Sequence, residues 1–575
     1  MSIAIAQMKI CAGQPAQNLE TMLQMIAEAR QKGAEMILFP ELSLSGLFPG
    51  DLIESECFRR ECSAANARIA AAATDIMVVY GNLDERGGKC YNAVFLAYNQ
   101  EVNRLAVPMG ESFIRGAYDR FARSHEFQVC HLPLGGRICR VGFLLGDWRD
   151  DTLLYRSEDI DLLVDLSCKP LRLDDLLEQP YVPGRQYISV NGFGLQNSGK
   201  TNYLFAGGSY FRAPDGRQAA IGAMFASGLY CWNNAPVSAG PETVLSAKQL
   251  IGPALASGVH EFCSLIHAQN AVIGISGGVD SALAACVYTQ ALGREHVWLV
   301  NMPTRFNSEQ TKSLAEQMAV GLGTNYALLP IEANVNSLAA QIEVSPYRTA
   351  AGDEANFKLS AAALENVQAR DRLRILAAVA AAVGGVVTCN GNKAELSVGY
   401  ATFYGDLAGA FAAQADLWKY QVYQAAAGFQ AIYPAAPLAE IAAIRPSAEL
   451  STEQDVTKGL GDPLIYRYHD YLLRAFVEQG LDPAAILSAY GAGELECLLG
   501  CEAGLSKELF RDAAAFVQDC EYWWRMYRTT GVAKRLQAPP LLALSRFPYG
   551  EEKPQAQEGV YCSGEYLKLK KELLA

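Results

Sequence analysis

A glycine-rich loop between a buried strand and a helix constrains this chain more than any other feature. Residues 271–275 form an apolar run that predicts a buried strand, and residues 282–292 follow a helical pattern. The connecting loop reads Ser276-Gly277-Gly278-Val279-Asp280-Ser281. Backbone N–H groups at such a turn, together with the positive end of the helix dipole, favour a bound anion. The loop lacks the lysine and the spacing of a Walker A motif.

Side chains of the loop extend this prediction to a polyphosphate. The hydroxyls of Ser276 and Ser281 are further donors, and Asp280 can hold a divalent metal against phosphates. A simple tight turn would need one glycine and no acid, so that interpretation leaves Asp280 unexplained. The loop resembles that of the PP-loop ATP pyrophosphatases, which implies that residues Gly274 and Ile275 also take part in binding ATP.

Composition excludes several classes of function. The chain has 575 residues, which favours two to four domains, and its net charge is −13. No cluster of lysine and arginine stands out, so we expect no nucleic-acid partner. No apolar stretch is long enough to span a membrane. The fifteen cysteines show no regular spacing and no signal peptide precedes them, which favours reduced thiols in the cytoplasm.

The first half of the chain predicts a layered α/β fold. Apolar runs indicate strands, and an amphipathic segment at 18–32 indicates a helix; the strands fall at 3–8, 36–39, 76–81, 93–98, 141–145 and 162–166. Their spacing favours a sandwich with mixed pairing. A polar stretch with proline and glycine at 233–241 separates this half from the second half of the chain. We therefore expect domains at 1–235 and 236–575.

The second half alternates strands with long helices. Strands are expected at 271–275, 297–302, 326–331 and 385–389. This alternation predicts a doubly wound parallel sheet, in which ligands gather at the carboxyl ends of the strands. The glycine-rich loop lies at such an end.

Several further motifs accompany the loop in order along the chain. They occupy residues 302–308, 365–370, 390–395, 399–406, 446–450 and 533–540. With these motifs, residues 271–537 resemble the NAD synthetase family. The resemblance implies a PP-loop (adenine nucleotide α-hydrolase) domain and a reaction in two steps. The carboxylate of deamido-NAD attacks the α-phosphorus of ATP, and ammonia then displaces AMP to form NAD.

The resemblance also implies roles for individual residues. Asp280 and Glu395 match the magnesium ligands of the family, Ser276 and Ser281 match its catalytic loop, and the remaining positions match contacts with ATP (residues 274–281, Arg305 and Asn390) or deamido-NAD (Asn366, Arg370, Tyr400, Thr402, Asp406 and Lys534). Plainer interpretations exist for Glu395 as an acid at a helix N-terminus, Arg370 as a surface cation and Lys534 as a basic residue beside a turn. The family commonly has threonine or alanine at Asn390 and serine at Ala394, and neither departure removes a metal ligand.

The first half resembles the nitrilase-type glutaminase domain that precedes some NAD synthetases, which implies an αββα sandwich. That family uses a glutamate, a lysine and a cysteine to hydrolyse glutamine through a thioester. Glu41 matches the glutamate, after a predicted strand, but Arg104 stands at the lysine position. The cysteine position falls on Leu145, or on Leu144 if the gap is placed differently.

No other placement of the gap supplies a nucleophile. Cys139 lies before the predicted strand and Cys168 belongs to a later turn. Without a thiolate no thioester can form. Arginine at the lysine position also replaces a compact ammonium group by a larger, planar guanidinium group. We therefore expect a degenerate glutaminase domain that serves as a scaffold.

Together these features predict an ATP- and Mg²⁺-dependent ligase that amidates deamido-NAD with free ammonia. The resemblance implies a homo-oligomer, and a separate glutaminase is a possible source of ammonia. Two alternatives stay open: the same adenylating site acting on a different carboxylate, or a nucleotide-binding pseudoenzyme. Intact Asp280 and Glu395 argue against the pseudoenzyme, and the missing cysteine argues against a carbon–nitrogen hydrolase.

Overall fold

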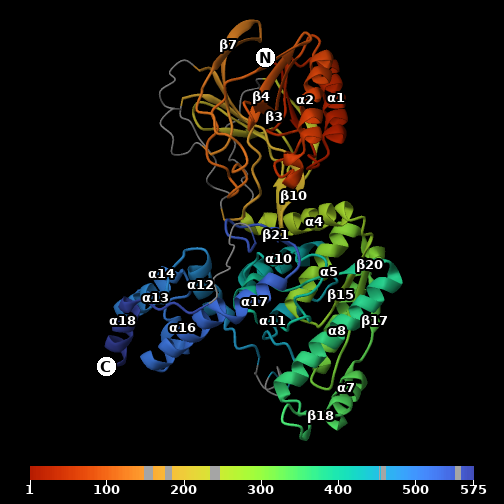
Figure 1. Cartoon of the computed structure of the whole chain (residues 1–575), viewed down its shortest axis with the longest axis vertical. Helices are drawn as coiled ribbons and strands as arrows, with labels where there is room; N and C mark the ends of the chain where they lie inside the picture. Colours follow the sequence, from red (N-terminus) through yellow and green to blue (C-terminus); the bar gives the residue numbers. More distant parts are fainter. Residues whose placement is uncertain (148–159, 175–183, 234–245, 452–453, 455–460, 551–558) are drawn as a thin grey trace. The chain divides into compact units, whose positions relative to one another are not determined.

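The structure is a computed structural model that describes the chain except residues 148–159, 175–183, 234–245, 452–453, 455–460 and 551–558. Its contacts divide the chain into two units, Met1–Ala247 and Lys248–Ala575. The domain boundary predicted at residue 235 lies outside the described residues. Figure 1 shows the chain coloured along its sequence, and each unit is considered below by itself.

The first unit is built on two six-stranded sheets. One has the order β14-β1-β2-β3-β4-β5 and the other the order β13-β12-β9-β8-β7-β6. The strands of the first are β14 (Gly228–Trp232), β1 (Ile3–Gln7), β2 (Met36–Leu38), β3 (Met77–Arg86), β4 (Lys89–Tyr98) and β5 (Glu101–Arg104). Those of the second are β13 (Gln218–Ala220), β12 (Tyr210–Arg212), β9 (Gln186–Ser189), β8 (Leu162–Asp165), β7 (Arg137–Leu144) and β6 (Val129–Leu134). A hairpin of β10 (Phe193–Ser198) and β11 (Thr201–Ala206) completes the described strands.

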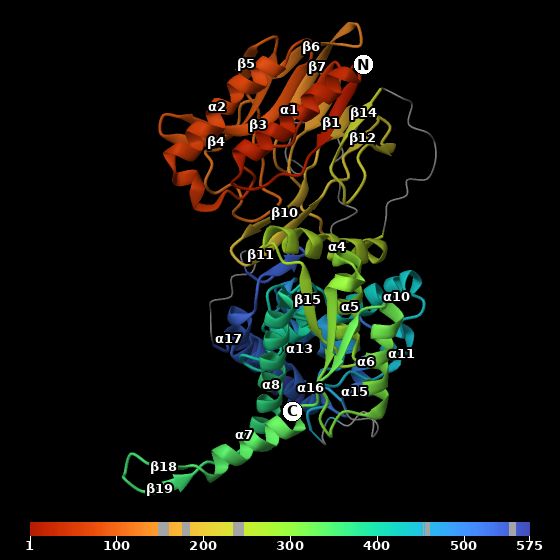
Figure 2. The ribbon, with the colours of Figure 1, turned by 90° about the vertical axis from the view of Figure 1, so that its right-hand side faces the viewer.

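Each sheet has parallel strands at its centre and antiparallel strands at its edges. Strands β1, β2 and β3 run parallel, as do β7, β8 and β9, whereas β3 and β4 form an antiparallel hairpin. Helices α1 (Pro15–Gln31) and α2 (Glu56–Ala72) cover the first sheet (Figure 2). The helix α1 begins with a proline, whose missing N–H costs nothing there, and buries Leu19, Met22 and Ile26. The predicted mixed pairing is confirmed.

The second unit contains a four-stranded parallel sheet. Its order is β17-β16-β15-β20, from strands β17 (Asn325–Leu328), β16 (Val297–Asn301), β15 (Asn270–Gly274) and β20 (Gly385–Val387). The chain moves from β15 to β16 and β17 on one side, and later returns to β20 on the other. The strand order therefore reverses beside β15, and the predicted doubly wound sheet is confirmed. Ligands in such folds bind where the order reverses.

Helices surround this sheet and continue beyond it. Helix α5 (Val279–Leu292) packs on β15 and β16, and helix α8 (Ala361–Val383) packs on β15 and β20. The others are α4 (Ala247–Leu265), α6 (Glu309–Leu322), α7 (Glu332–Val344), α9 (Lys393–Val398), α10 (Lys419–Ile432) and α11 (Leu438–Ala443). A separate apolar core forms among α12 (Tyr466–Val477), α13 (Pro483–Ala492), α14 (Leu495–Leu499), α15 (Leu505–Leu509), α16 (Ala513–Arg528) and α18 (Gly564–Leu574). Helix α17 (Thr530–Gln537) and strand β21 (Leu541–Ala543) lie between α16 and α18 in the chain.

Strands β5, β6 and β9 to β14 were not predicted, and two further local features were also not predicted. Strands β3 and β4 are longer than the apolar runs because they pair through residues 86 and 89 around a two-glycine turn. A small hairpin of β18 (Pro346–Arg348) and β19 (Glu354–Asn356) extends from α7 (Figure 2). Within the described part of the chain, no helix has both the length and the apolar character needed to cross a bilayer.

Candidate functional site

The glycine-rich loop leaves the carboxyl end of β15 and opens helix α5. Gly277 has a φ of 83°, and a Cβ there would lie 2.3 Å from the Thr311 carbonyl oxygen. Only glycine fits, because both the backbone angle and the contact with α6 exclude a side chain. The loop is thereby held against the start of α6, with its N–H groups free of a bulky side chain.

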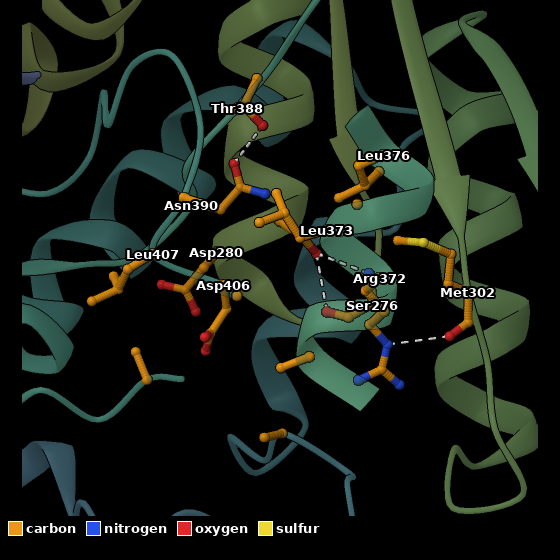
Figure 3. Close-up of a pocket in the computed structure, with 18 of the residues that line it drawn as sticks. Ser276, Asp280, Met302, Arg372, Leu373, Leu376, Thr388, Asn390, Asp406 and Leu407 are labelled. Carbon is orange, nitrogen blue, oxygen red and sulfur yellow. Dashed lines mark hydrogen bonds between the residues drawn. The ribbon is translucent and has the colours of Figure 1, made fainter. Parts of the chain in front are cut away.

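The two serines of the loop are bonded to each other. The Ser281 hydroxyl lies 3.2 Å from the Ser276 hydroxyl and accepts the Ser276 backbone N–H at 3.3 Å (Figure 3). It also donates to the Gly278 carbonyl at 3.0 Å. These hydrogen bonds hold the loop in a fixed conformation at the N-terminus of α5. A helix N-terminus with free backbone N–H groups is a typical anion site.

The predicted metal ligands are brought together by one asparagine. The Asn392 side-chain amide donates to Asp280 Oδ1 at 3.0 Å, while its oxygen accepts the Glu395 N–H at 3.1 Å. Glu395 Oε2 in turn accepts the Asn392 backbone N–H at 3.2 Å, which makes a capping box at the start of α9. Lys419 forms an ion pair with Asp280, and its Nζ lies 4.0 Å from Glu395 Oε1.

The charges in this cluster are not balanced. Burial, and then the negative charge of Asp280, raise the pKa of Glu395 to about 8. Burial alone would lower the pKa of Lys419, but its attraction to Asp280 and Glu395 raises it. A second cation would stabilise the ionised form of both acids.

The donor set fits a magnesium ion. Two carboxylates lie at the edge of a loop suited to phosphate, and Mg²⁺ usually takes one or two carboxylates, substrate phosphates and water. Among the described residues no three acidic, histidine or cysteine side chains converge on one point, so the protein alone offers no closed cage. Asp280 and Glu395 are therefore the residues that would hold the ion.

A cavity of about 260 Å³ opens beside the loop and combines two kinds of wall (Figure 3). One is apolar and includes Ile275, Met302, Leu376 and Val387. The other is polar and includes seven of the predicted site residues: Ser276, Asp280, Ser281, Asn390, Glu395, Tyr400 and Asp406. A ligand that carries both an apolar base and charged phosphates could place the base against the apolar wall and the phosphates against the polar wall.

Helix α8 presents two different faces to this region. On one face Gln368 accepts a hydrogen bond from the Thr304 hydroxyl at 3.3 Å, and Leu376 packs against Gly274. On the other, Asn366 accepts from the Thr402 hydroxyl at 2.9 Å and Arg370 donates to the Phe403 carbonyl at 3.0 Å. The first face points to the loop and the end of β16, and the second to residues 399–406.

Residues 399–406 are held in place from several sides. Lys534 Nζ donates to the Gly399 carbonyl at 2.8 Å and also to the Ala401 carbonyl. Asp406 accepts the Thr402 N–H at 2.7 Å, and the Tyr400 hydroxyl donates to Asp462 at 3.2 Å. The predicted substrate residues Asn366, Arg370, Tyr400, Thr402, Asp406 and Lys534 thus converge on one segment.

Arg305 is not brought into this cluster. Its guanidinium is 67% exposed and pairs with Glu332 at 3.3 Å, away from the residues that line the cavity. Arg370 and Lys534 bind backbone carbonyls rather than facing the cavity. Their predicted contacts with ATP or deamido-NAD stay predictions.

Sequence reasoning missed several polar residues of the site. Lys419 lies 139 residues from its partner Asp280, and nothing in the local sequence links the two. The Tyr466 hydroxyl lies 3.4 Å from a carboxylate oxygen of Asp462 and 3.4 Å from one of Glu395. Only the fold brings these two acids together. Arg372 had a local signal, since it stands four residues from both Gln368 and Leu376 on one face of a helix.

In the first unit, Glu41 follows β2 and is almost completely buried. Its carboxylate accepts hydrogen bonds from the Asn92 amide at 2.5 Å, the Tyr118 hydroxyl at 2.6 Å and the Cys168 backbone N–H at 2.7 Å. Burial raises the pKa of Glu41 to about 7 despite these bonds. The three donors fix the position of the carboxylate and leave one of its acceptor positions unused.

The other two positions of the predicted degenerate site are not among these three donors to the Glu41 carboxylate. Arg104 ends β5, where it pairs with Asp84 at 2.9 Å and stands over the ring of Tyr91. Leu145 follows β7 and is fully buried, and Leu144 packs into an apolar cluster with Tyr187. The Cys168 thiol points to the Glu41 carbonyl at 3.7 Å, and burial raises its pKa.

Each half of the chain matches a known protein family. A family model described as NAD synthase matches residues 253–496, and one described as carbon-nitrogen hydrolase matches residues 2–103. The glutamine-dependent NAD(+) synthetase of Xylella fastidiosa strain 9a5c is 29% identical, over 87% of this chain and 92% of that protein. The same enzyme of Synechocystis is 27% identical, over 96% and 97%.

Solved structures show the same fold. A glutamine-dependent NAD(+) synthetase from Cytophaga hutchinsonii has a TM-score of 0.73 at 16% identity, covering 100% of this chain and 99% of that one. A glutamine-dependent NAD+ synthetase from Acinetobacter baumannii, in complex with ADP, has a TM-score of 0.66 at 23% identity, covering 91% and 94%. Residues 253–496 thus match the NAD synthase family and residues 2–103 the carbon-nitrogen hydrolase family, and over most of its length the chain is similar to glutamine-dependent NAD(+) synthetases.

Proposed function

We propose that this chain forms NAD from deamido-NAD and ATP with free ammonia as the nitrogen donor. The observation that carries the proposal is the cluster of Asp280, Glu395, Asn392 and Lys419 beside the glycine-rich loop. Two partly buried acids held by one amide next to an anion site suit a reaction between a carboxylate and a polyphosphate.

The reaction requires that negative charge be neutralised as the carboxylate approaches the α-phosphorus. The backbone N–H groups of the loop and the hydroxyls of Ser276 and Ser281 would bind phosphate oxygens. Asp280 and Glu395 would hold Mg²⁺, which supplies charge neutralisation at the phosphates. The segment 399–406, held by Asn366, Arg370 and Lys534, would position the deamido-NAD carboxylate.

Ammonia would then attack the acyl adenylate and release AMP. This step needs the adenylate to be shielded from water, and the cavity's apolar wall supports that requirement. It needs no covalent intermediate with the protein, so the second unit can carry out the chemistry by itself.

The nitrogen donor is the point at which this chain departs from its relatives, which are named glutamine-dependent. Leu145 has no nucleophilic atom. This supports ammonia over glutamine, because the thioester route needs a thiolate.

The direct experiment supplies the purified protein with ATP, Mg²⁺ and deamido-NAD, adds ammonium or glutamine in separate reactions, and measures NAD and AMP. We expect NAD and AMP in equal amounts with ammonium and little of either with glutamine. Pyrophosphate release with another carboxylate, and none with deamido-NAD, would favour a ligase of different specificity. ATP binding without turnover of any carboxylate would favour the pseudoenzyme.

A further inference from the structure

Arg372 is a buried cation inside the candidate site that forms no close ion pair among the described residues, although the charges of Asp406, Glu449 and Asp371 act on it from further away. Its Nε donates to the Met302 carbonyl at 3.3 Å, and its Nη2 lies 3.5 Å from the Asn307 side-chain oxygen (Figure 3). Among the described residues no acid comes within ion-pair distance of it. Burial lowers the pKa of Arg372 to about 10, which indicates that the guanidinium lies in a poorly solvated place.

A buried charge without a close counter-ion costs stability, so a negatively charged ligand beside Arg372 would stabilise it. A guanidinium has five N–H donors, and here two of its nitrogens make only long hydrogen bonds, at 3.3 and 3.5 Å. The remaining donors form a planar fork that matches the oxygens of a phosphate or a carboxylate. Arg372 lines the same cavity as Ser276, Asp280 and Ser281.

The position of Arg372 on α8 decides between these two anions. It lies one helical turn from Leu376, which packs on Gly274 at the start of the loop, and one turn from Gln368, which contacts Thr304. Asn366 and Arg370, on the other face, contact residues 399–406 instead. Arg372 therefore faces the phosphate loop rather than the segment predicted to bind deamido-NAD.

We propose that Arg372 binds the phosphate oxygens of ATP, opposite the backbone N–H groups of the glycine-rich loop. This inference rests on the proposed function, because it takes ATP as the ligand of the loop. It adds a residue that binds the reacting polyphosphate and compensates for charge on the side that Asp280 and Glu395 do not reach.

The test compares the variants Arg372→Gln and Arg372→Lys with Arg374→Gln by calorimetric binding of ATP, pyrophosphate, adenosine and deamido-NAD. Arg374 is the matched control, because it lies on the same helix, is 67% exposed and pairs with Asp371. We expect Arg372→Gln to weaken ATP and pyrophosphate binding by about 10- to 100-fold, the range of charge-assisted hydrogen bonds. The affinities for adenosine and deamido-NAD should not change. Arg372→Lys should lose less affinity for ATP and pyrophosphate than Arg372→Gln, because lysine keeps the positive charge although it lacks the planar guanidinium group.

Thermal unfolding separates this role from a structural one. Removal of an unpaired buried charge should leave the melting temperature of Arg372→Gln unchanged or higher, whereas the stabilisation by added ATP should shrink. Equal losses for adenosine and ATP, or a loss confined to deamido-NAD, would overturn the inference. An Arg372→Gln variant that binds ATP as tightly as wild type would also overturn the inference. The proposed function would still stand in that case if the wild-type protein forms NAD. A wild-type protein that binds no ATP would overturn both.

Discussion

Both units place an acidic residue where a strand ends, yet the two acids have different surroundings. Asp280, with Glu395 beside it, lines a cavity and faces a loop of N–H groups. Glu41 lies in a packed interior and accepts hydrogen bonds from Asn92, Tyr118 and Cys168. The difference teaches that an acid suited to bind a ligand is recognised by its access to a cavity. By that criterion the second unit holds the candidate site, and the first holds a buried polar network.

The strongest way to break this comparison is to remove the acid of the second unit. Asp280→Asn keeps the size of the side chain but removes its charge, so the site would lose a metal ligand. We expect NAD formation to fall by at least about 10³-fold, since the cation supplies several kcal/mol of charge stabilisation. Steady-state assays at saturating Mg²⁺ measure this, with exposed Glu309→Gln as control. Near-normal turnover would disprove the metal-ligand assignment.

The acid of the first unit should instead affect stability. The pKa of Glu41 is raised from its ordinary 4.5 to about 7, so the folded state binds this proton more tightly than the unfolded state. Its contribution to stability is therefore fully present below about pH 4.5 and is lost as pH rises through 7, a change of about 3 kcal/mol. Glu41→Gln cannot ionise and should lack this loss.

Urea unfolding of the full-length protein at several pH values tests this expectation. The free energy of unfolding of Glu41→Gln relative to wild type should increase between pH 4.5 and 7. Exposed Glu61→Gln is the matched control and should show no such trend. A constant difference across this range would mean that the burial of Glu41 carries no electrostatic cost.

The pH dependence of the reaction sharpens the comparison. At fixed, subsaturating total ammonium, free ammonia increases about tenfold per pH unit below the pKa of ammonium. We expect the rate of NAD formation to follow it, and Glu41→Gln to give the same profile as wild type. A change of slope near pH 7 in the pH profile of NAD formation, absent from the profile of Glu41→Gln, would show that Glu41 takes part in catalysis.

The smallest effect is expected from restoring the missing glutaminase residues. Leu145→Cys together with Arg104→Lys should leave glutamate release from glutamine at background. A thiol at a fully buried position would be disfavoured as a thiolate. A glutamine-dependent relative serves as the positive control. Clear glutamate production by the double variant would show that the pocket was intact.

Local sequence signals predicted much of the second unit. The strand, the glycine turn and the helix around Ser276 are encoded within about twenty residues, because each depends on nearby patterning. The metal-ligand pair could be named only through resemblance, since Asn392 couples Asp280 to Glu395 across more than a hundred residues. Lys419 depends on packing between distant elements, which local periodicity does not encode, whereas the spacing of Arg372 from Gln368 and Leu376 was a local signal that went unused.

The first unit was less predictable for the same reason. The apolar runs located β1, β2, β7 and β8 closely, but the partners of Glu41 come from residues 92, 118 and 168. The absence of a nucleophile at Leu145 could be inferred from sequence. That the remaining acid is held by three donors could not, because hydrogen bonds between distant segments depend on the fold.

One measurement tests the central claim that the second unit makes NAD without help from a glutaminase. The purified protein receives ATP, Mg²⁺ and deamido-NAD with equal concentrations of unlabelled ammonium and glutamine labelled with ¹⁵N in its side-chain amide. Mass spectrometry of the product NAD then reports the source of its amide nitrogen, with glutamate measured in parallel. The account predicts unlabelled NAD and no glutamate above background. NAD that carries ¹⁵N, with glutamate formed in step, would contradict it.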